Sequence, residues 1–374
     1  MNLSILDMNK PFVTVLLALA VFLPDANAAA PLHVDLRDKW ALWNGPTTLR
    51  GANIWQKRVK RDDEMGTGPV GPPYSQQDFE HLAAWGANYV NISHPGTFTE
   101  KPAYRFDPGV FENLTALIDR AQRAGLFVVV AFRTGPGRNE TVFGGEEERK
   151  LDAGWGSQAA QEGWIEMWRD TARRLKDRSV VVGYDLMVEP ETKKHRLWNA
   201  LARKITQAIR EVDPRTPILV GAADWSTVDS LDSLQLTDDS RTVYVVHQYE
   251  PYAYSHQKRK AVGYNPEKLE SVYHKLREFK ARQRVPLVVN EFGAVRHAPE
   301  VHRFTEDQMR QLESLGANHA LWLWETSFRL NYDEFNFRHG PDRNHHADVS
   351  SSLLIDVIKR NWGLNRVRPE RSQP

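Results

Sequence analysis

Short apolar segments alternate with longer amphipathic segments along most of the chain, from residue 49 to residue 362. Eight of the apolar segments have the length and the β-branched or otherwise apolar content of strands that are buried on both faces. They comprise residues 49–54, 89–93, 127–132, 180–187, 218–221, 243–247, 287–290 and 320–323. Between them, apolar residues recur at helical spacing and predict helices over residues 111–124, 161–176, 195–211, 266–283 and 305–315.

Local signals at the ends of the helical segments support this assignment. Asp107 and Pro108 supply a capping side chain and a first-turn proline, while Gly125 and Gly316 end two helices directly before a strand. Eight consecutive strand–helix units predict an α/β protein with a (β/α)8 TIM barrel, because an open doubly wound sheet usually has fewer strands. Since the longest loops follow strands, we expect long βα loops to form a substrate cleft at one rim of the barrel.

Composition excludes several classes of function. Lys and Arg number 49 and Asp and Glu 48, so the net charge of +1 provides no field that would attract nucleic acid. The sequence has no cysteine, which excludes disulfides, thiol nucleophiles and thiolate metal sites. The 12 Trp residues are unusually many. Their flat apolar faces suit a sugar ring, although large rings also fill a large core.

The first 28 residues have the pattern of a secretory signal peptide. Lys10 precedes an apolar run over residues 12–23, and small residues in an A-x-A arrangement end at Ala28. A retained membrane anchor is the alternative, but the run has about twelve residues where a spanning helix needs roughly 20. We therefore predict a secreted or periplasmic protein without stable membrane insertion. Its expected parts are a signal peptide (1–28), a single barrel domain (29–362) and a disordered C-terminal tail (363–374).

Two glutamates directly follow apolar strands and carry the main functional hypothesis. Glu189 comes after the fourth strand and precedes Pro190, and Glu291 comes after the seventh strand. The C-termini of all barrel strands meet at one rim, so the two carboxylates can face each other across one cleft. Retaining glycosidases need such a pair roughly 5 to 5.5 Å apart, one as acid and one as nucleophile. For either glutamate alone, a solvated carboxylate at a helix start is the competing interpretation.

Aromatic and imidazole side chains are expected at neighbouring strand ends. His247 and Tyr249 share one side of an extended segment and can flank a bound ring or hydrogen-bond the carboxylates. Trp324, at the mouth of the barrel, is the candidate stacking floor for a sugar, whereas Trp322 has the same parity and is expected deeper in the core.

In these pieces the chain resembles glycoside hydrolase family 5, the cellulase and mannanase family of retaining enzymes with glutamates on strands four and seven. The matching motifs span nearly the whole mature chain: E-P at Glu189, H-x-Y from His247 to Tyr249, E-F-G at Glu291 and the tryptophan Trp324. The resemblance implies hydrolysis of a β-linked glycan, of glucan or mannan type, without a cofactor or a metal. It also implies the residue roles: Glu189 acid/base, Glu291 nucleophile, Tyr249 partner of the nucleophile, His247 contact near the acid, Trp324 subsite floor.

The sequence also departs from the family pattern. Members usually have Asn before the acid, where this chain has Val188, which cannot hydrogen-bond a sugar 2-hydroxyl. Members usually have Arg after the second strand and His after the third, where this chain has Asn91 and Arg133. We hypothesise that Arg133 replaces a cation and holds Glu291 ionised. Asn91 and His94 are further candidates for substrate contact.

Other interpretations stay open at this stage. A carbohydrate-binding barrel with weak or no catalysis is motivated by Val188, and a transglycosylase would differ only in accepting a sugar instead of water. His339, His345, His346 and Asp348 form a cluster that could bind a metal, but surface loops commonly collect such residues without one. We expect an oligo- or polysaccharide as the partner, and a monomer.

Overall fold

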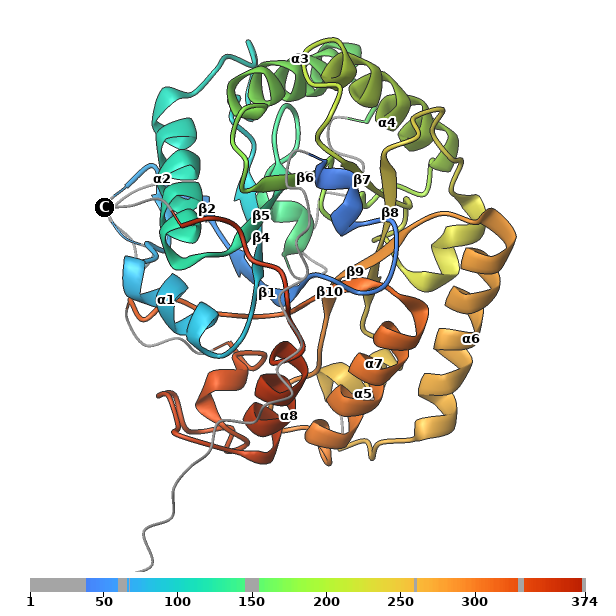
Figure 1. The fold of residues 1–374 in the computed structure, drawn as a ribbon. Coiled ribbons are helices and arrows are strands. Elements are labelled where there is room, and N and C mark those ends of the chain that lie inside the picture. The colour runs from blue at the N-terminus through green and yellow to red at the C-terminus, as the bar shows by residue number, and fades with distance from the viewer. Residues whose placement is uncertain are drawn as a thin grey trace, which may run out of the picture. The chain divides into compact units, whose positions relative to one another are not determined.

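Eight parallel strands close into a barrel in the computed structural model, which describes residues 38–59, 66, 68–144, 155–258, 261–328 and 333–371. The strands follow chain order around the barrel, and the last closes on the first (Figure 1). The barrel strands are β1 (Arg50–Trp55), β4 (Tyr89–Pro95), β5 (Phe127–Thr134), β6 (Val181–Asp185), β7 (Ile218–Gly221), β8 (Thr242–Gln248), β9 (Leu287–Phe292) and β10 (Asn318–Leu321). A separate antiparallel pair is formed by β2 (Lys57–Arg58) and β3 (Val70–Gly71).

Helices surround the barrel (Figure 1). The α-helices are α1 (Gln76–Ala84), α2 (Pro108–Ala124), α3 (Gln158–Leu175), α4 (His195–Arg210), α5 (Tyr252–His256), α6 (Pro266–Gln283), α7 (Val301–Leu315) and α8 (Leu353–Trp362). The 3-10 helices are η1 (Lys39–Leu42), η2 (Glu140–Phe143), η3 (Val228–Ser233) and η4 (Phe337–His339). The predicted (β/α)8 architecture is therefore confirmed, with element ends that differ from the predicted ones by a few residues.

The helix ends confirm the local signals in the sequence. The Asp107 side chain accepts a hydrogen bond from the backbone N–H of Val110, and Pro108 occupies the first turn of α2. Gly125 and Gly316 end α2 and α7 in the left-handed conformation, with φ of 75° and 59°. A side chain disfavours that conformation, so each glycine turns the chain sharply into the next strand.

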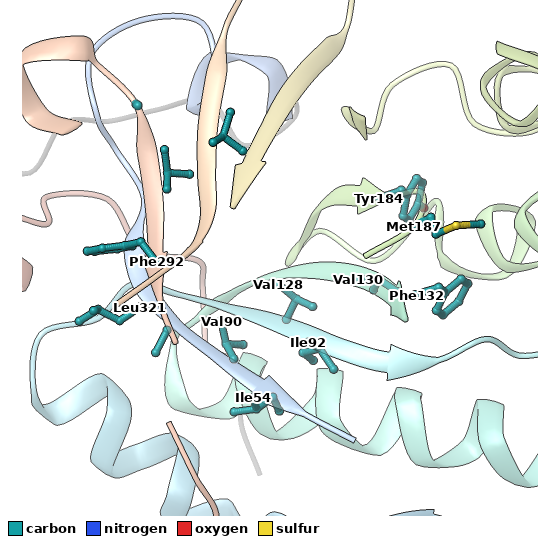
Figure 2. Packing of buried hydrophobic residues seen from close by; sticks show 14 of the residues in the cluster. Ile54, Val90, Ile92, Val128, Val130, Phe132, Tyr184, Met187, Phe292 and Leu321 are labelled. Carbon is teal, nitrogen blue, oxygen red and sulfur yellow. The ribbon is translucent and has the colours of Figure 1, made fainter. Parts of the chain in front are cut away.

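Alternating strand residues fill two separate layers of core. One layer lies inside the barrel and includes Tyr89, Val129 and Val245, with Leu42 and Trp43 from η1 and its cap packed against them. The other lies between the strands and the helices; Figure 2 shows part of it, including Val90, Ile92, Val128 and Val130. This alternation decides which side chains can reach the barrel axis, and thus which can reach a site at its rim.

The segment that follows α8 differs from the expected disordered tail. Val367 is 5% exposed and belongs to the inner core layer. Its carbonyl accepts a hydrogen bond of 2.9 Å from Asn88, and Arg368 donates to the carbonyl of Ala87 at 2.7 Å. The expected signal peptide lies outside the described residues. Among the residues described, no helix is long and apolar enough to cross a membrane.

Candidate active site

A cleft of about 1140 Å³ lies where the C-terminal ends of the barrel strands meet, with the two glutamates in its wall. Its lining combines carboxylates, cations and aromatic rings. These residues include Arg133, Phe143, Val188, Glu189, Trp225, His247, Tyr249, Tyr252, His256, Lys258, Glu291, Trp322 and Phe335. Of the predicted site residues, the cleft therefore unites Glu189, Glu291, His247, Tyr249 and Arg133.

Glu291 reaches the cleft because of an irregularity in β9. Val246 and His247 of β8 pair with Val289 and Glu291, so Asn290 is one extra residue on β9. An inserted residue of this kind changes the facing of the side chains that follow it. Val288 and Asn290 therefore point into the barrel and Glu291 also reaches the rim, which strict alternation would forbid.

Glu189 is held differently, since it lies beyond the end of β6 and not on a strand. Its backbone has φ of 50°, a left-handed conformation that is uncommon for a residue with a side chain. Its carbonyl accepts a hydrogen bond of 2.8 Å from Arg138. The side chain of Glu189 is 19% exposed, against 6% for Glu291, so the two carboxylates differ in access to water.

His247 brings the two carboxylates together. Its Nδ1 lies 3.1 Å from Glu189 Oε1 and 3.3 Å from Glu291 Oε2. One oxygen of each carboxylate and one ring nitrogen of His247 lie within 4.8 Å of one another. The Tyr249 hydroxyl donates a hydrogen bond of 3.2 Å to Glu291 Oε2. The four side chains thus form one hydrogen-bonded group at the rim.

The charges in this group shift one another's pKa values. Burial alone would lower the pKa of His247, but the carboxylates of Glu291 and Glu189 outweigh it and raise that pKa to about 9. Burial raises the pKa of Glu291 to about 7, with a further increase from Glu189 and an opposing decrease from His247, Arg133 and Tyr249. His247 is therefore a cation at neutral pH. The nearby carboxylate of Glu189 disfavours the ionised form of Glu291, because two like charges at this distance repel each other.

Arg133 lines the cleft but does not grip Glu291 as hypothesised. Its Nε donates to Glu140 Oε1 at 2.9 Å, and its Nη1 donates to Ser93 Oγ at 3.2 Å. Its guanidinium carbon lies 4.1 Å from the ring centroid of Phe143. Glu140 in η2 supplies the nearer carboxylate, so Arg133 acts on Glu291 only as a nearby positive charge that lowers its pKa.

Asn91 and His94 do not line the cleft. Asn91 points into the barrel and donates to Asn53 Oδ1 at 2.6 Å, and Asn53 in turn donates to the carbonyl of Asn290 at 2.9 Å. Asn91 is therefore linked through Asn53 to the strand that carries Glu291. His94 has the opposite parity on β4 and faces α2, where its Nε2 lies 3.0 Å from Asn113 Oδ1.

The two tryptophans after β10 exchange their predicted places. Trp324 is 1% exposed, packs edge-on against Trp85, and donates from its indole to the carbonyl of Asp78 at 3.0 Å. Trp322 is the one that lines the cleft. Because β10 ends at Leu321, the alternation of a strand does not extend to Trp324, and parity alone misplaced both rings.

Sequence reasoning also missed residues on the other wall of the cleft. Phe143, from the loop after β5, and Trp225, from the loop after β7, contact each other edge-on at a centroid distance of 6.4 Å. Asp224, Trp225 and Ser226 all have left-handed backbones, with φ of 60°, 68° and 54°. No motif marks these positions, although the many tryptophans indicated that some would line a cleft.

The same carboxylates and imidazole also have the geometry of a metal-binding group. Within the described parts of the chain, Glu189, His247 and Glu291 are the one set of three such ligands found close together. The raised pKa of His247 favours its protonated form, which has no lone pair for a metal. His339 and Asp348 of the predicted loop cluster lie 3.9 Å apart, and Asp348 also pairs with Arg338.

The family model described as "Cellulase (glycosyl hydrolase family 5)" matches residues 46–327. Endoglucanase C of Acetivibrio thermocellus is 23% identical over 331 residues, which cover 76% of this chain and 91% of that protein. Endoglucanase CelA of Streptomyces lividans is 22% identical over 293 residues, covering 76% of this chain and 55% of that protein.

Solved structures share the fold. Endoglucanase Cel5A of Thermotoga maritima superposes with a TM-score of 0.65 at 20% identity, covering 87% of this chain and 100% of that one. Cellulose synthase subunit Z of Clostridioides difficile superposes with a TM-score of 0.64 at 18% identity, covering 83% and 99%. The family match spans most of the sequence and includes both cleft glutamates. The chain belongs to glycoside hydrolase family 5, and it is a glycoside hydrolase.

Proposed function

We propose that this hydrolase cleaves a β-linked glycan with retention of configuration, with Glu189 as acid/base and Glu291 as nucleophile. The observation that carries the proposal is the spacing of the two carboxylates, whose nearest oxygens lie within 4.8 Å. Double displacement needs carboxyl groups about 5 to 5.5 Å apart, whereas inverting enzymes separate them by about 6.5 to 9.5 Å to admit a water molecule. The spacing favours direct attack by a carboxylate.

In the first step, Glu291 attacks the anomeric carbon and Glu189 gives its proton to the leaving glycosidic oxygen. The C–O bond to the leaving sugar breaks as the bond to Glu291 forms, so the leaving sugar departs as an alcohol. Tyr249 directs the attacking oxygen through its hydrogen bond to Glu291 Oε2. The cationic His247, between both carboxylates, favours the ionised form of Glu291.

In the second step, Glu189 removes a proton from a water molecule, which attacks the same carbon and releases Glu291. The greater exposure of the Glu189 side chain supports this role, because the water molecule that it deprotonates comes from solvent. A sugar hydroxyl in place of water would give transglycosylation by the same route.

The substrate class proposed is a β-linked glucan or mannan. Structures of the related Thermotoga maritima Cel5A contain cellobiose or mannotriose, and the relatives with curated names are mostly endoglucanases. The aromatic walls at Trp322 and at Trp225 with Phe143 suit the apolar faces of such sugars. Val188, 2% exposed beside Glu189, offers no hydrogen bond to a sugar hydroxyl. The signal-peptide pattern in residues 1–28 further supports action in the periplasm or outside the cell.

The covalent intermediate provides the test. The protein is first screened on carboxymethylcellulose, β-glucan, glucomannan and mannan, and then incubated with the 2,4-dinitrophenyl 2-deoxy-2-fluoro glycoside of the preferred sugar. We expect the intact mass to increase by one glycosyl unit, and peptide mapping to locate that unit on Glu291. Product anomers observed by NMR before mutarotation should keep the β configuration. Initial α products, or a label on another residue, would contradict the proposal.

A further inference from the structure

Arg138 is a buried arginine behind the rim that the catalytic steps above do not use. A tight turn after β5 presents it, in which Gly135 and Arg138 exchange two backbone hydrogen bonds of 2.9 Å each. Gly137 in this turn has φ of 72°, which favours glycine. The side chain of Arg138 is 2% exposed, so its charge must be neutralised by groups within the protein.

Three acceptors surround the guanidinium. Nε donates to Glu191 Oε2 at 2.8 Å, Nη2 donates to the carbonyl of Glu189 at 2.8 Å, and Nη1 donates to the carbonyl of Arg133. The other oxygen of Glu191 accepts a hydrogen bond of 2.7 Å from the indole of Trp155. Arg138 thus joins the end of β5 to Glu189 in the loop that follows β6. Glu191, whose side chain is fully buried, holds Arg138 in place.

The group that Arg138 holds is the backbone of Glu189. The left-handed conformation costs about 1 to 2 kcal/mol for a residue with a side chain, so surrounding contacts must maintain it. On the far side, the backbone of Trp225 donates to the carbonyl of Pro190 at 3.1 Å. The loop that carries Glu189 is therefore attached both to the β5 turn and to the β7 loop.

We propose that Arg138 and Glu191 are positioning residues that aim the carboxyl group of Glu189 at the leaving oxygen. This inference rests on the proposed role of Glu189 as the acid. A buried ion pair is by itself weak evidence for stability, because desolvation offsets much of its attraction. Arg138 binds Glu191 and also the backbone carbonyls of two cleft residues, Arg133 and Glu189. The pair therefore fixes the position of Glu189, and a displacement of 1 Å at a catalytic group costs up to about 10²-fold in rate.

The test compares leaving groups in Arg138→Met and Glu191→Gln. The value of kcat/KM reports the first irreversible step, which here is cleavage of the glycosidic bond. Dinitrophenolate leaves readily without being protonated, whereas phenolate is a poor leaving group and needs a proton from the acid. We expect kcat/KM for phenyl β-cellobioside to decrease about 10- to 100-fold, with little change for the 2,4-dinitrophenyl β-cellobioside. Aryl β-mannobiosides replace these probes if mannan is the preferred polymer. Arg138→Lys keeps the positive charge but loses the several N–H donors of the guanidinium. Its kcat/KM for phenyl β-cellobioside should lie between the values of the wild type and of Arg138→Met.

Arg210→Met is the matched control. Arg210 also joins a carboxylate, that of Asp239, to two backbone carbonyls, those of Asp213 and Thr216, but it lies at the end of α4 before β7 begins. Its substitution should leave the ratio of the two kcat/KM values at the wild-type level, even if the melting temperature decreases. Equal losses on both substrates in Arg138→Met and Glu191→Gln, or no loss, would overturn the inference. If Glu189→Ala itself shows no dependence on the leaving group, the proposed acid is wrong instead.

Discussion

The two sides of the cleft hold their glutamates by different means. Glu291 belongs to β9, between β8 and β10, and the barrel's backbone hydrogen bonds fix its position. Glu189 lies past the end of β6 in a left-handed conformation, and the side chain of Arg138 holds its backbone carbonyl. The first is almost enclosed and the second is in partial contact with solvent.

This difference matches what each residue does in the proposed mechanism. A nucleophile needs one fixed direction of attack and little competition from water, which a strand residue inside the rim provides. An acid/base gives up a proton in one step and takes another from water in the next, so it needs access to solvent. A loop residue can have that access, but the orientation of its side chain then depends on neighbouring residues, such as Arg138 for Glu189.

Replacing each glutamate by alanine should give the largest difference in rate between the two sides of the cleft. We expect Glu291→Ala to lower kcat on the order of 10⁵- to 10⁶-fold, the scale for loss of a nucleophile. Glu189→Ala should lower the hydrolysis of poor leaving groups by about 10²- to 10⁴-fold, the usual contribution of a general acid. Added azide should restore turnover of an activated aryl glycoside in both variants, with opposite stereochemistry.

The products identify which carboxylate is missing. In Glu189→Ala, azide attacks the glycosyl-enzyme and should give a β-glycosyl azide, measured by NMR. In Glu291→Ala, azide occupies the place of the lost carboxylate. It then attacks the anomeric carbon of the activated β-aryl glycoside from the α face and displaces the aryl group with inversion, so the product should be an α-glycosyl azide. The same azide anomer from both variants would contradict the distinction between the two sides.

Much of the fold, and less of the site, was readable in the sequence. The eight barrel strands were predicted because each is apolar on both faces. Five of the predicted site residues line the cleft: Arg133, Glu189, His247, Tyr249 and Glu291. These residues lie on barrel strands or in the segments that follow them, at the rim where the fold brings strand ends together. The motifs that surround them gave their order along the chain.

Alternation along a strand does not place every rim residue. The extra residue Asn290 brings Glu291 to the rim against parity, so the motif and not the alternation predicted its place. The placement of Trp324 was wrong, because β10 ends at Leu321 and Trp324 lies outside the cleft. The pairing of Arg138 with Glu191 joins residues 53 positions apart on two loops, and nothing in their spacing indicates it. Such contacts depend on tertiary packing, which local pattern does not contain.

The aromatic rings provide a smaller contrast between the two sides. Trp225 contacts Phe143 across the strand that leads to Glu189, on the side where the leaving sugar should lie. We expect Trp225→Ala to lower kcat/KM for cellotetraose roughly tenfold, the equivalent of one lost ring contact. For β-cellobiosyl fluoride, which has no leaving sugar, kcat/KM should not change. Trp225→Phe keeps a ring and should recover most of the loss; equal losses on both substrates would place Trp225 elsewhere in binding.

The smallest effect expected is a change in pH dependence when His247, which touches both sides, is replaced. Glu291 must be ionised to attack the anomeric carbon, so kcat/KM should increase as pH rises through the pKa of Glu291, which is about 7. His247, with a pKa of about 9, stays cationic over this range and favours the charged carboxylates. In His247→Gln this cation is gone, the pKa of Glu291 rises, and the acidic limb of the kcat/KM profile, where activity increases with pH, should move to higher pH. His256 also lines the cleft, but burial lowers its pKa to about 4, so His256→Gln removes no charge at neutral pH and should leave the limb in place. If the acidic limb moves to lower pH in His247→Gln, or moves equally in both variants, His247 does not favour the ionised form of Glu291.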